Sequence, residues 1–152
     1  MITEENLQKA KETIKEFFDK TGFDIEVSIL PLNDKTIPVR INTEDPKVLI
    51  GQNGQTLADV QHLLKTMVSH NIADQFYIDL DINNYKEKKM TYIRESVREW
   101  ANDVALTRKE KVLDPMPSFE RRVVHMELAN RSDIQTESAG QGIDRHIIIR
   151  PC

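Results

Sequence analysis

The segment LIGQNGQTL, residues 49–57, places two glycines on either side of Gln52 and Asn53. Glycine has no Cβ, so Gly51 and Gly54 permit positive φ and let another backbone approach the loop closely. Because a helix is predicted to follow the loop, its free N–H groups and its dipole favour an anion such as a phosphate there. The alternative interpretation is that the two glycines only build a tight connection between two helices.

The elements around this loop predict an α+β module over residues 1–84. Apolar spacing indicates helices at 3–20, 45–50 and 55–70, and alternation of apolar and polar residues indicates strands at 23–30, 36–41 and 75–82. The resulting order is α-β-β-α-α-β, with a three-stranded sheet that starts with a hairpin. Its outward face is predicted to carry one aromatic residue, Tyr77, and four acidic residues, Asp24, Glu26, Asp79 and Asp81. Such a face is a poor surface for stacking nucleic-acid bases.

A second, smaller α+β module is predicted over residues 85–152. It opens with a long helix, capped by Asn83 or Asn84, and the buried stripe of this helix is formed by Ile93, Val97, Trp100, Ala101 and Val104. The segment DPMP at 114–117 then breaks the chain before a helix at 118–130. Strands at 133–138 and 145–150 flank a turn and predict a short antiparallel sheet.

The helix at 118–130 carries Arg121 and His125, which are four residues apart and therefore share one helical face. Arginine supplies a forked cation suited to phosphate oxygens, and a neighbouring imidazole can donate a further hydrogen bond or stack on a base. We expect this face to lie opposite Phe119, Val123 and Met126. For an isolated pair with this spacing, an ordinary solvated helix face is the simpler interpretation.

Composition and charge limit the classes of function. The chain has 152 residues and a net charge of −4. Because Cys152 is its one cysteine, we expect neither a disulfide framework nor a cysteine-based metal site. We also expect a reducing compartment, the cytoplasm. Residues 1–85 hold 8 basic and 14 acidic side chains, whereas residues 86–152 hold 13 and 11. The N-terminal segment mixes charged and apolar residues, so we expect no membrane insertion. No P-loop or nucleophile elbow is present, and we expect neither cofactor, metal nor catalysis.

The Gly-x-x-Gly loop in its α-β-β-α-α-β context resembles a type II KH domain, and the Arg121-x-x-x-His125 segment with the strands after it resembles the R-three-H domain. Taken together, from about Glu5 to Pro151, the chain is similar to the Jag (SpoIIIJ-associated) family of bacterial RNA-binding proteins, also called KhpB. The resemblance implies that Gly51, Gln52, Asn53 and Gly54 clamp the backbone of about four single-stranded nucleotides. It also implies that Arg121 and His125 form a second site. Many members carry an additional N-terminal Jag-N domain, which we expect this chain to lack.

These features predict a non-catalytic protein that binds single-stranded RNA, or single-stranded DNA, with both modules contributing to one surface. Because Gln52 and Asn53 are neutral, the first module is expected to bind weakly and with a shallow salt dependence. The larger electrostatic contribution is expected from Lys86, Lys89, Arg94, Arg121, Arg122 and Arg145. By the resemblance, the protein would act in bacterial post-transcriptional regulation or as an RNA chaperone linked to the cell envelope and elongation. The alternative is a protein-interaction adaptor, in which a degenerate KH module pairs with a second small KH protein or with itself.

Overall fold

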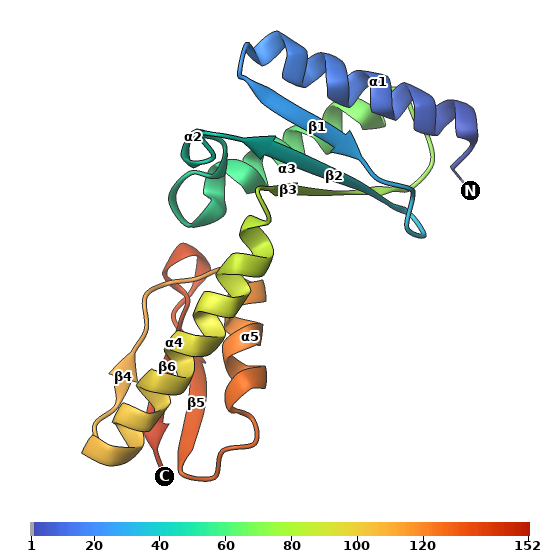
Figure 1. The fold of residues 1–152 in the computed structure, drawn as a ribbon. Helices are drawn as coiled ribbons and strands as arrows, with labels where there is room; N and C mark the ends of the chain where they lie inside the picture. The colour runs from blue at the N-terminus through green and yellow to red at the C-terminus, as the bar shows by residue number, and fades with distance from the viewer. Residues whose placement is uncertain (1) are drawn as a thin grey trace. The chain divides into compact units, whose positions relative to one another are not determined.

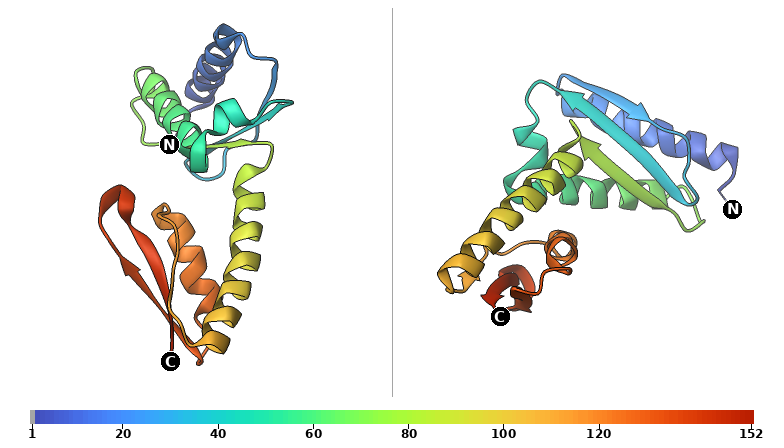
Figure 2. Two further views of the ribbon diagram at one scale, coloured as in Figure 1. Left: turned by 90° about the vertical axis from the view of Figure 1, so that its left-hand side faces the viewer. Right: turned by 60° about the horizontal axis from the view of Figure 1, so that its bottom comes forward.

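The computed structural model describes residues 2–152 and divides the chain into two compact units, Met1–Tyr85 and Lys86–Cys152. Both units combine helices with a three-stranded sheet (Figures 1 and 2), so the predicted α+β class is confirmed. Each unit has its own hydrophobic core. Over the described residues, none of the helices is both long and apolar enough to cross a membrane.

The first unit has the predicted α-β-β-α-α-β order. Its elements are α1 (Glu4–Thr21), β1 (Ile25–Ile29), β2 (Thr36–Thr43), α2 (Lys47–Ile50), the 3₁₀ turn η1 (Gln52–Gly54), α3 (Gln55–Ser69) and β3 (Tyr77–Ile82). The sheet order is β1-β2-β3, in which β1 and β2 form the predicted antiparallel hairpin and β3 runs parallel to β2. Parallel pairing is possible because α2 and α3 carry the chain back along the sheet before β3 begins.

Helix α1 is capped at both ends. The side chain of Thr3 accepts a hydrogen bond from the N–H of Asn6 at 3.2 Å, and Gly22 closes the helix in the left-handed conformation, with φ 71°. Between them, a stripe of residues spaced by four is buried: Ala10, Ile14 and Phe18. This stripe packs into the core together with α3.

The core of the first unit lies between the sheet and the helices α1 and α3, which cover the same face of the sheet (Figure 2). Along β2, Ile37, Val39 and Ile41 are at most 1% exposed, whereas the residues between them are only partly buried. This alternation follows from the two-residue period of a strand. Burial of one sheet face therefore fixes the register of the strands beneath the helices.

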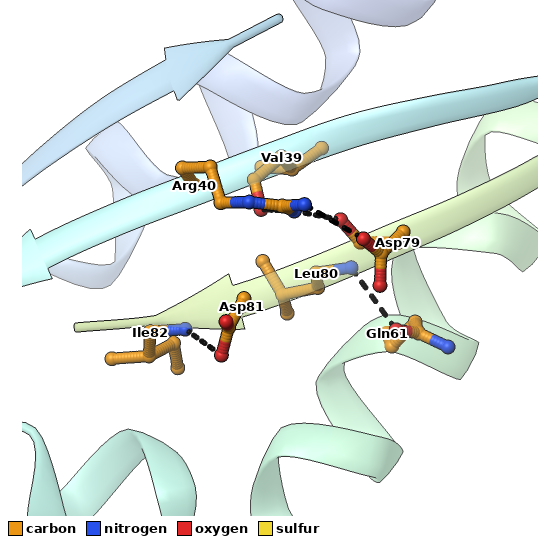
Figure 3. Close-up of polar contacts among 7 residues, drawn as sticks. All are labelled: Val39, Arg40, Gln61, Asp79, Leu80, Asp81 and Ile82. Atoms are coloured by element: carbon orange, nitrogen blue, oxygen red, sulfur yellow. Dashed lines mark hydrogen bonds and ion pairs between the residues drawn. The ribbon is translucent and has the colours of Figure 1, made fainter. Parts of the chain in front are cut away.

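Two side chains accept hydrogen bonds from backbone N–H groups of the edge strand β3 (Figure 3). Gln61 of α3 accepts the N–H of Leu80 at 3.0 Å, and the carboxylate of Asp81 accepts the N–H of Ile82 at 2.9 Å. The sequence predicts Asp81 to be solvated, and this is wrong, because the residue is only 8% exposed and its carboxylate turns to the backbone of its own strand. These two positions of β3 thus have their backbone donors satisfied within the unit.

The outward face of the first sheet is less acidic than the sequence suggests. Arg40 lies beside Asp79, with Nη2 at 2.8 Å from the carboxylate and Nη1 donating to the Asp79 carbonyl at 2.8 Å (Figure 3). Tyr77 is 49% exposed, but the ammonium of Lys65 lies 5.1 Å from its ring centroid. A neutralised acidic residue and a partly covered ring still make a poor surface for base stacking.

The junction between β3 and the next helix is a left-handed turn at Asn83 and Asn84, which have φ of 50° and 56°. The side chain of Asn83 accepts the N–H of Thr43 at 2.9 Å and donates to its carbonyl at 2.8 Å. Asn83 therefore joins the ends of β2 and β3, where the sequence suggested that it would cap the following helix. Asparagine suits this position because its side chain tolerates the left-handed region.

The second unit contains one more strand than the sequence predicts. The elements are α4 (Tyr85–Thr107), whose first residue belongs to the first unit, β4 (Lys111–Val112), α5 (Ser118–Leu128), β5 (Ile134–Ala139), the 3₁₀ turn η2 (Gly142–Asp144) and β6 (His146–Pro151). The sheet order is β4-β6-β5 and both pairings are antiparallel. Two residues are too few to show alternation, so β4 has no signal in the sequence.

Helix α4 buries the predicted stripe of residues, whereas α5 buries a different face from the one that the sequence predicts. Ile93, Val97, Ala101 and Val104 are buried, and Trp100 is partly buried against them. On α5, Phe119 and Met126 are 45% and 67% exposed, although the sequence placed both opposite the Arg121 and His125 face. The buried residues are instead Glu120, Val124 and Leu128, which repeat every four positions.

Glu120 is an acidic residue in this buried stripe and is 6% exposed. Burial raises the pKa of its carboxyl group, and the positive charge of Lys89 on α4 opposes that rise without cancelling it. Above its folded pKa the unit must therefore hold a largely desolvated negative charge.

We expect Glu120→Gln to raise the free energy of unfolding of the second unit at neutral pH. Because the folded pKa is raised, the stability contribution of Glu120 is full below its ordinary pKa of 4.5 and is lost as the pH rises through the folded value. An amide has no charge to desolvate, so the variant should lose this part of the pH dependence. Urea unfolding from about pH 4 to pH 8, followed by the fluorescence of Trp100, the single tryptophan, measures the effect. A pH profile equal to that of the wild type would contradict it.

Candidate nucleic-acid interface

The loop between α2 and α3 depends on residues with positive φ. Gly51 has φ 70° and ψ −175°, a combination that is essentially restricted to glycine. Asn53, with φ 53°, and Gly54, with φ 77°, lie in the left-handed region that asparagine and glycine tolerate best. The side chains of Gln52 and Asn53 are exposed. The loop is thus a defined turn that presents two neutral amides to solvent.

Close neighbours also restrict both positions, Gly51 more strictly than Gly54. A Cβ on Gly51 would lie 2.1 Å from Oγ1 of Thr56, and a Cβ on Gly54 would lie 3.1 Å from the ring of Tyr85. The interpretation of the loop as a tight connection therefore has a physical basis. It does not compete with ligand binding, because the residues between the glycines stay outside these contacts.

An open hollow of about 620 Å³ lies beside the loop. Its lining residues are Pro46, Lys47, Ile50, Gly51, Gln52, Asn53 and Tyr85. Lys47 adds a cation and Tyr85 an aromatic ring, the two kinds of group that single-stranded nucleic-acid sites combine. Neither residue was predicted from the sequence to belong to the site. Lys47 precedes the loop by four residues and could have been found by its proximity, whereas Tyr85 reaches the loop only through the fold.

In the second unit, Arg121 and His125 are both partly buried and both held by a hydrogen bond. Nη1 of Arg121 donates to the carbonyl of Met116 at 2.6 Å, which fixes the guanidinium against the segment that leads into α5. Nδ1 of His125 lies 2.8 Å from Oγ1 of Thr136 on β5. Since Nδ1 is engaged, Nε2 is the ring nitrogen left for a ligand. A solvated helix face with an incidental histidine would not need either contact.

Arg145 joins the same group of residues. Its Nε donates to Oγ of Ser138 at 3.0 Å, and its carbonyl accepts the N–H of Met116 at 3.1 Å. Ser138 and Thr136 are two residues apart on β5 and therefore point to the same face of the strand. These hydrogen bonds close a ring of contacts between α5, β5, Met116 and the end of the β5–β6 turn. The ring consists of Met116, Arg121, His125, Thr136, Ser138 and Arg145.

The other basic residues predicted to support the site differ in whether an acidic side chain lies close to them. Lys89 faces the buried carboxylate of Glu120, and Arg94 lies 4.0 Å from Glu127, which Arg98 also approaches at 2.5 Å. By contrast, Arg122 is exposed on α5 beside Arg121. Lys86 is partly buried at the start of α4. Of the basic residues predicted for the site, Arg121, Arg122 and Arg145 therefore lie on or beside the ring.

We expect Gly51→Ala to destabilise the first unit by roughly 2–6 kcal/mol, since alanine would be strained at this backbone conformation and would overlap Thr56. Gly22→Ala is the comparison, because Gly22 lies in the left-handed region, with φ 71° and ψ 6°, and a Cβ there would meet nothing within 4 Å. This variant should cost only about 1–2 kcal/mol. Hydrogen exchange of the α3 amides measures both effects, and equal losses of protection would show that neither the backbone conformation of Gly51 nor its contact with Thr56 matters.

Comparison with known proteins supports the assignment of the second unit. Residues 89–151 match the family model of the R-three-H domain, a match that contains α5 and the strands β5 and β6. The match includes Arg121, His125 and every other residue of the ring described above.

Three relatives are similar over most of the chain, and each is named RNA-binding protein KhpB. The protein of Clostridium symbiosum is 32% identical over 147 residues, which are 95% of this chain and 66% of the relative. The protein of Lactiplantibacillus plantarum is 32% identical over 111 residues, or 73% of this chain and 34% of the relative. The protein of Bacillus subtilis is 32% identical over 117 residues, or 76% and 56%.

The chain thus spans between about a third and two thirds of the length of these relatives. The similarity to the Clostridium symbiosum protein extends across 95% of the chain, well beyond the matched domain. The chain therefore belongs to the KhpB family, and its second unit contains the R-three-H domain of that family.

Proposed function

We propose that this protein binds single-stranded RNA without catalysing a reaction, and that the ring around Met116 in the second unit is its main contact surface. The observation that carries the proposal is that Arg121 and His125 are each oriented by a hydrogen bond, to Met116 and Thr136. An arginine held in place loses less side-chain freedom when it binds a phosphate. The names of the relatives, which call them RNA-binding proteins, support the choice of ligand.

The loop at Gly51–Gly54 makes the second and weaker contact in this proposal. Gln52 and Asn53 can donate hydrogen bonds to phosphate or base edges, but they release no counterions. Lys47 and Tyr85 beside the loop supply one cation and one aromatic surface. The first unit should therefore add affinity that is modest and depends little on salt.

We further propose that the protein acts in the cytoplasm as a post-transcriptional regulator or RNA chaperone, in a pathway linked to the cell envelope. The family assignment supports this role, and single-stranded DNA is a chemically similar ligand. A second candidate is an adaptor that pairs through its first unit with a small KH protein or with itself. The excess of acidic over basic residues in the first 85 residues favours this candidate, because a negative surface repels phosphates.

The first test compares Arg121→Ala with His125→Ala, alone and combined, for binding to a labelled pool of single-stranded RNA. Each loss of a charge-assisted hydrogen bond should weaken binding by about 10- to 100-fold. Arg121→Ala should also reduce the slope of log K against log salt by about 0.7. Fluorescence anisotropy between about 50 and 200 mM salt measures both quantities.

Two controls accompany this test. Lys15→Ala removes one positive charge from an exposed position of α1 in the other unit and should leave affinity nearly unchanged. The fluorescence of Trp100 reports whether the second unit remains folded. If the wild-type protein retains no RNA at low salt, the proposal is wrong. The adaptor candidate then predicts a stoichiometric protein complex that survives nuclease treatment.

A second test adds charge to the loop of the first unit without touching its glycines. Gln52 is exposed, so Gln52→Lys should preserve the turn while it tightens RNA binding and steepens the salt slope by about 0.7. Gln52→Glu has nearly the same shape as the wild type and should weaken binding. If neither variant differs from the wild type in affinity, the loop does not contact RNA.

A further inference from the structure

The turn between β5 and β6 exposes one apolar side chain almost completely. Ile143 is 93% exposed at the tip of this turn, inside the short 3₁₀ segment η2. A single exposed aliphatic residue needs no explanation by itself. Ile143 differs from other exposed aliphatic residues in the backbone that holds it and in the residues beside it.

The tip is a structured turn with several internal contacts. The N–H of Asp144 donates to the carbonyl of Gln141 at 3.1 Å, and the N–H of Arg145 donates to the carbonyl of Gly142 at 3.3 Å. Gly140 has φ 81°, and a Cβ there would lie 2.6 Å from the carbonyl oxygen of Asp144. Ile143 is therefore presented by an ordered backbone, so a ligand that covers it would pay little ordering entropy.

The tip is also connected directly to the ring that carries Arg121. Arg145, two residues after Ile143, binds Ser138 through its side chain and Met116 through its carbonyl. Met116 in turn accepts the guanidinium of Arg121. The exposed isoleucine is thus two residues along the chain from an arginine that takes part in these contacts.

We propose that Ile143 is an apolar platform for one base of a single-stranded RNA whose phosphates contact Arg121 and Arg145; this inference rests on the proposed function. The order of residues favours a base over a phosphate at the tip, because Asp144 follows Ile143 directly and would repel a phosphate there. A base has an uncharged face that an aliphatic side chain can cover, so its burial removes apolar surface from water.

The charge pattern also favours RNA over a protein partner. The tip offers one aliphatic residue two positions before an arginine, whereas protein interfaces are centred on a cluster of buried apolar and aromatic residues. A nucleotide needs only one apolar surface for its base and one cation for its phosphate. A protein partner at Ile143 is the competing outcome of the test.

The test compares Ile143→Ala with Leu106→Ala for binding to a labelled single-stranded RNA pool. Leu106 is the matched control, because it is 85% exposed on α4 and takes no part in the ring. Ile143→Ala should weaken binding by roughly 5- to 20-fold with an unchanged salt slope, because an apolar contact releases no counterions. Arg145→Ala should instead reduce the slope by about 0.7. Ile143→Trp should tighten binding, since its ring offers a larger stacking surface.

The outcomes separate this inference from the function on which it rests. If Ile143→Ala binds like the wild type while the Arg121→Ala and His125→Ala variant loses binding, the platform is wrong and the RNA site stands. If Ile143→Ala lowers affinity no more than Leu106→Ala does, the platform is equally wrong. If wild-type protein binds no RNA, the proposed function itself fails. Because Ile143 is almost fully exposed, none of its variants should alter unfolding followed at Trp100.

Discussion

The backbone of Met116 is the constraint on which the candidate site of the second unit depends. Its carbonyl receives the guanidinium of Arg121, and its N–H donates to the carbonyl of Arg145. Pro115 and Pro117 flank this residue, and their rings limit the freedom of the segment between α4 and α5. A short segment with little regular structure thus determines where two cations from different elements lie. Both hydrogen bonds use backbone atoms of Met116, while its side chain packs against the core of the second unit.

In the proposed function, the two units would contact an anionic chain by different physical means. The loop at Gly51–Gly54 offers defined shape, because its backbone conformations are restricted, but it offers no charge of its own. The second unit offers charge on oriented side chains. Shape contributes contacts that are insensitive to salt, whereas charge contributes long-range attraction and counterion release. A protein that carries both can keep part of its affinity when the ionic strength changes.

The elements with clear periodicity could be predicted from the sequence, and the contacts between distant elements could not. The capped helix α1, the hairpin of β1 and β2 and the buried stripe of α4 follow from local patterns. By contrast, β4 is too short to show a pattern, and the buried face of α5 contains Glu120, whose charge indicates exposure. The motif residues could be placed on one helix by their spacing. Their partners, Met116 and Thr136, could not be identified, because a hydroxyl or a carbonyl carries no signal that tells which side chain it will bind.

The occupied edge of β3 has a consequence for how the protein behaves in a crowded cell. An open strand edge is a template on which the strand of another chain can add, and such addition begins many aggregates. At Leu80 and Ile82 the donors of β3 are already bonded to Gln61 and Asp81, so an incoming strand would first have to break those bonds. Along this edge, the N–H groups of Leu80 and Ile82 are therefore not available to a partially folded neighbour. Asp81 and Gln61 thus make strand addition at the β3 edge of the first sheet less favourable.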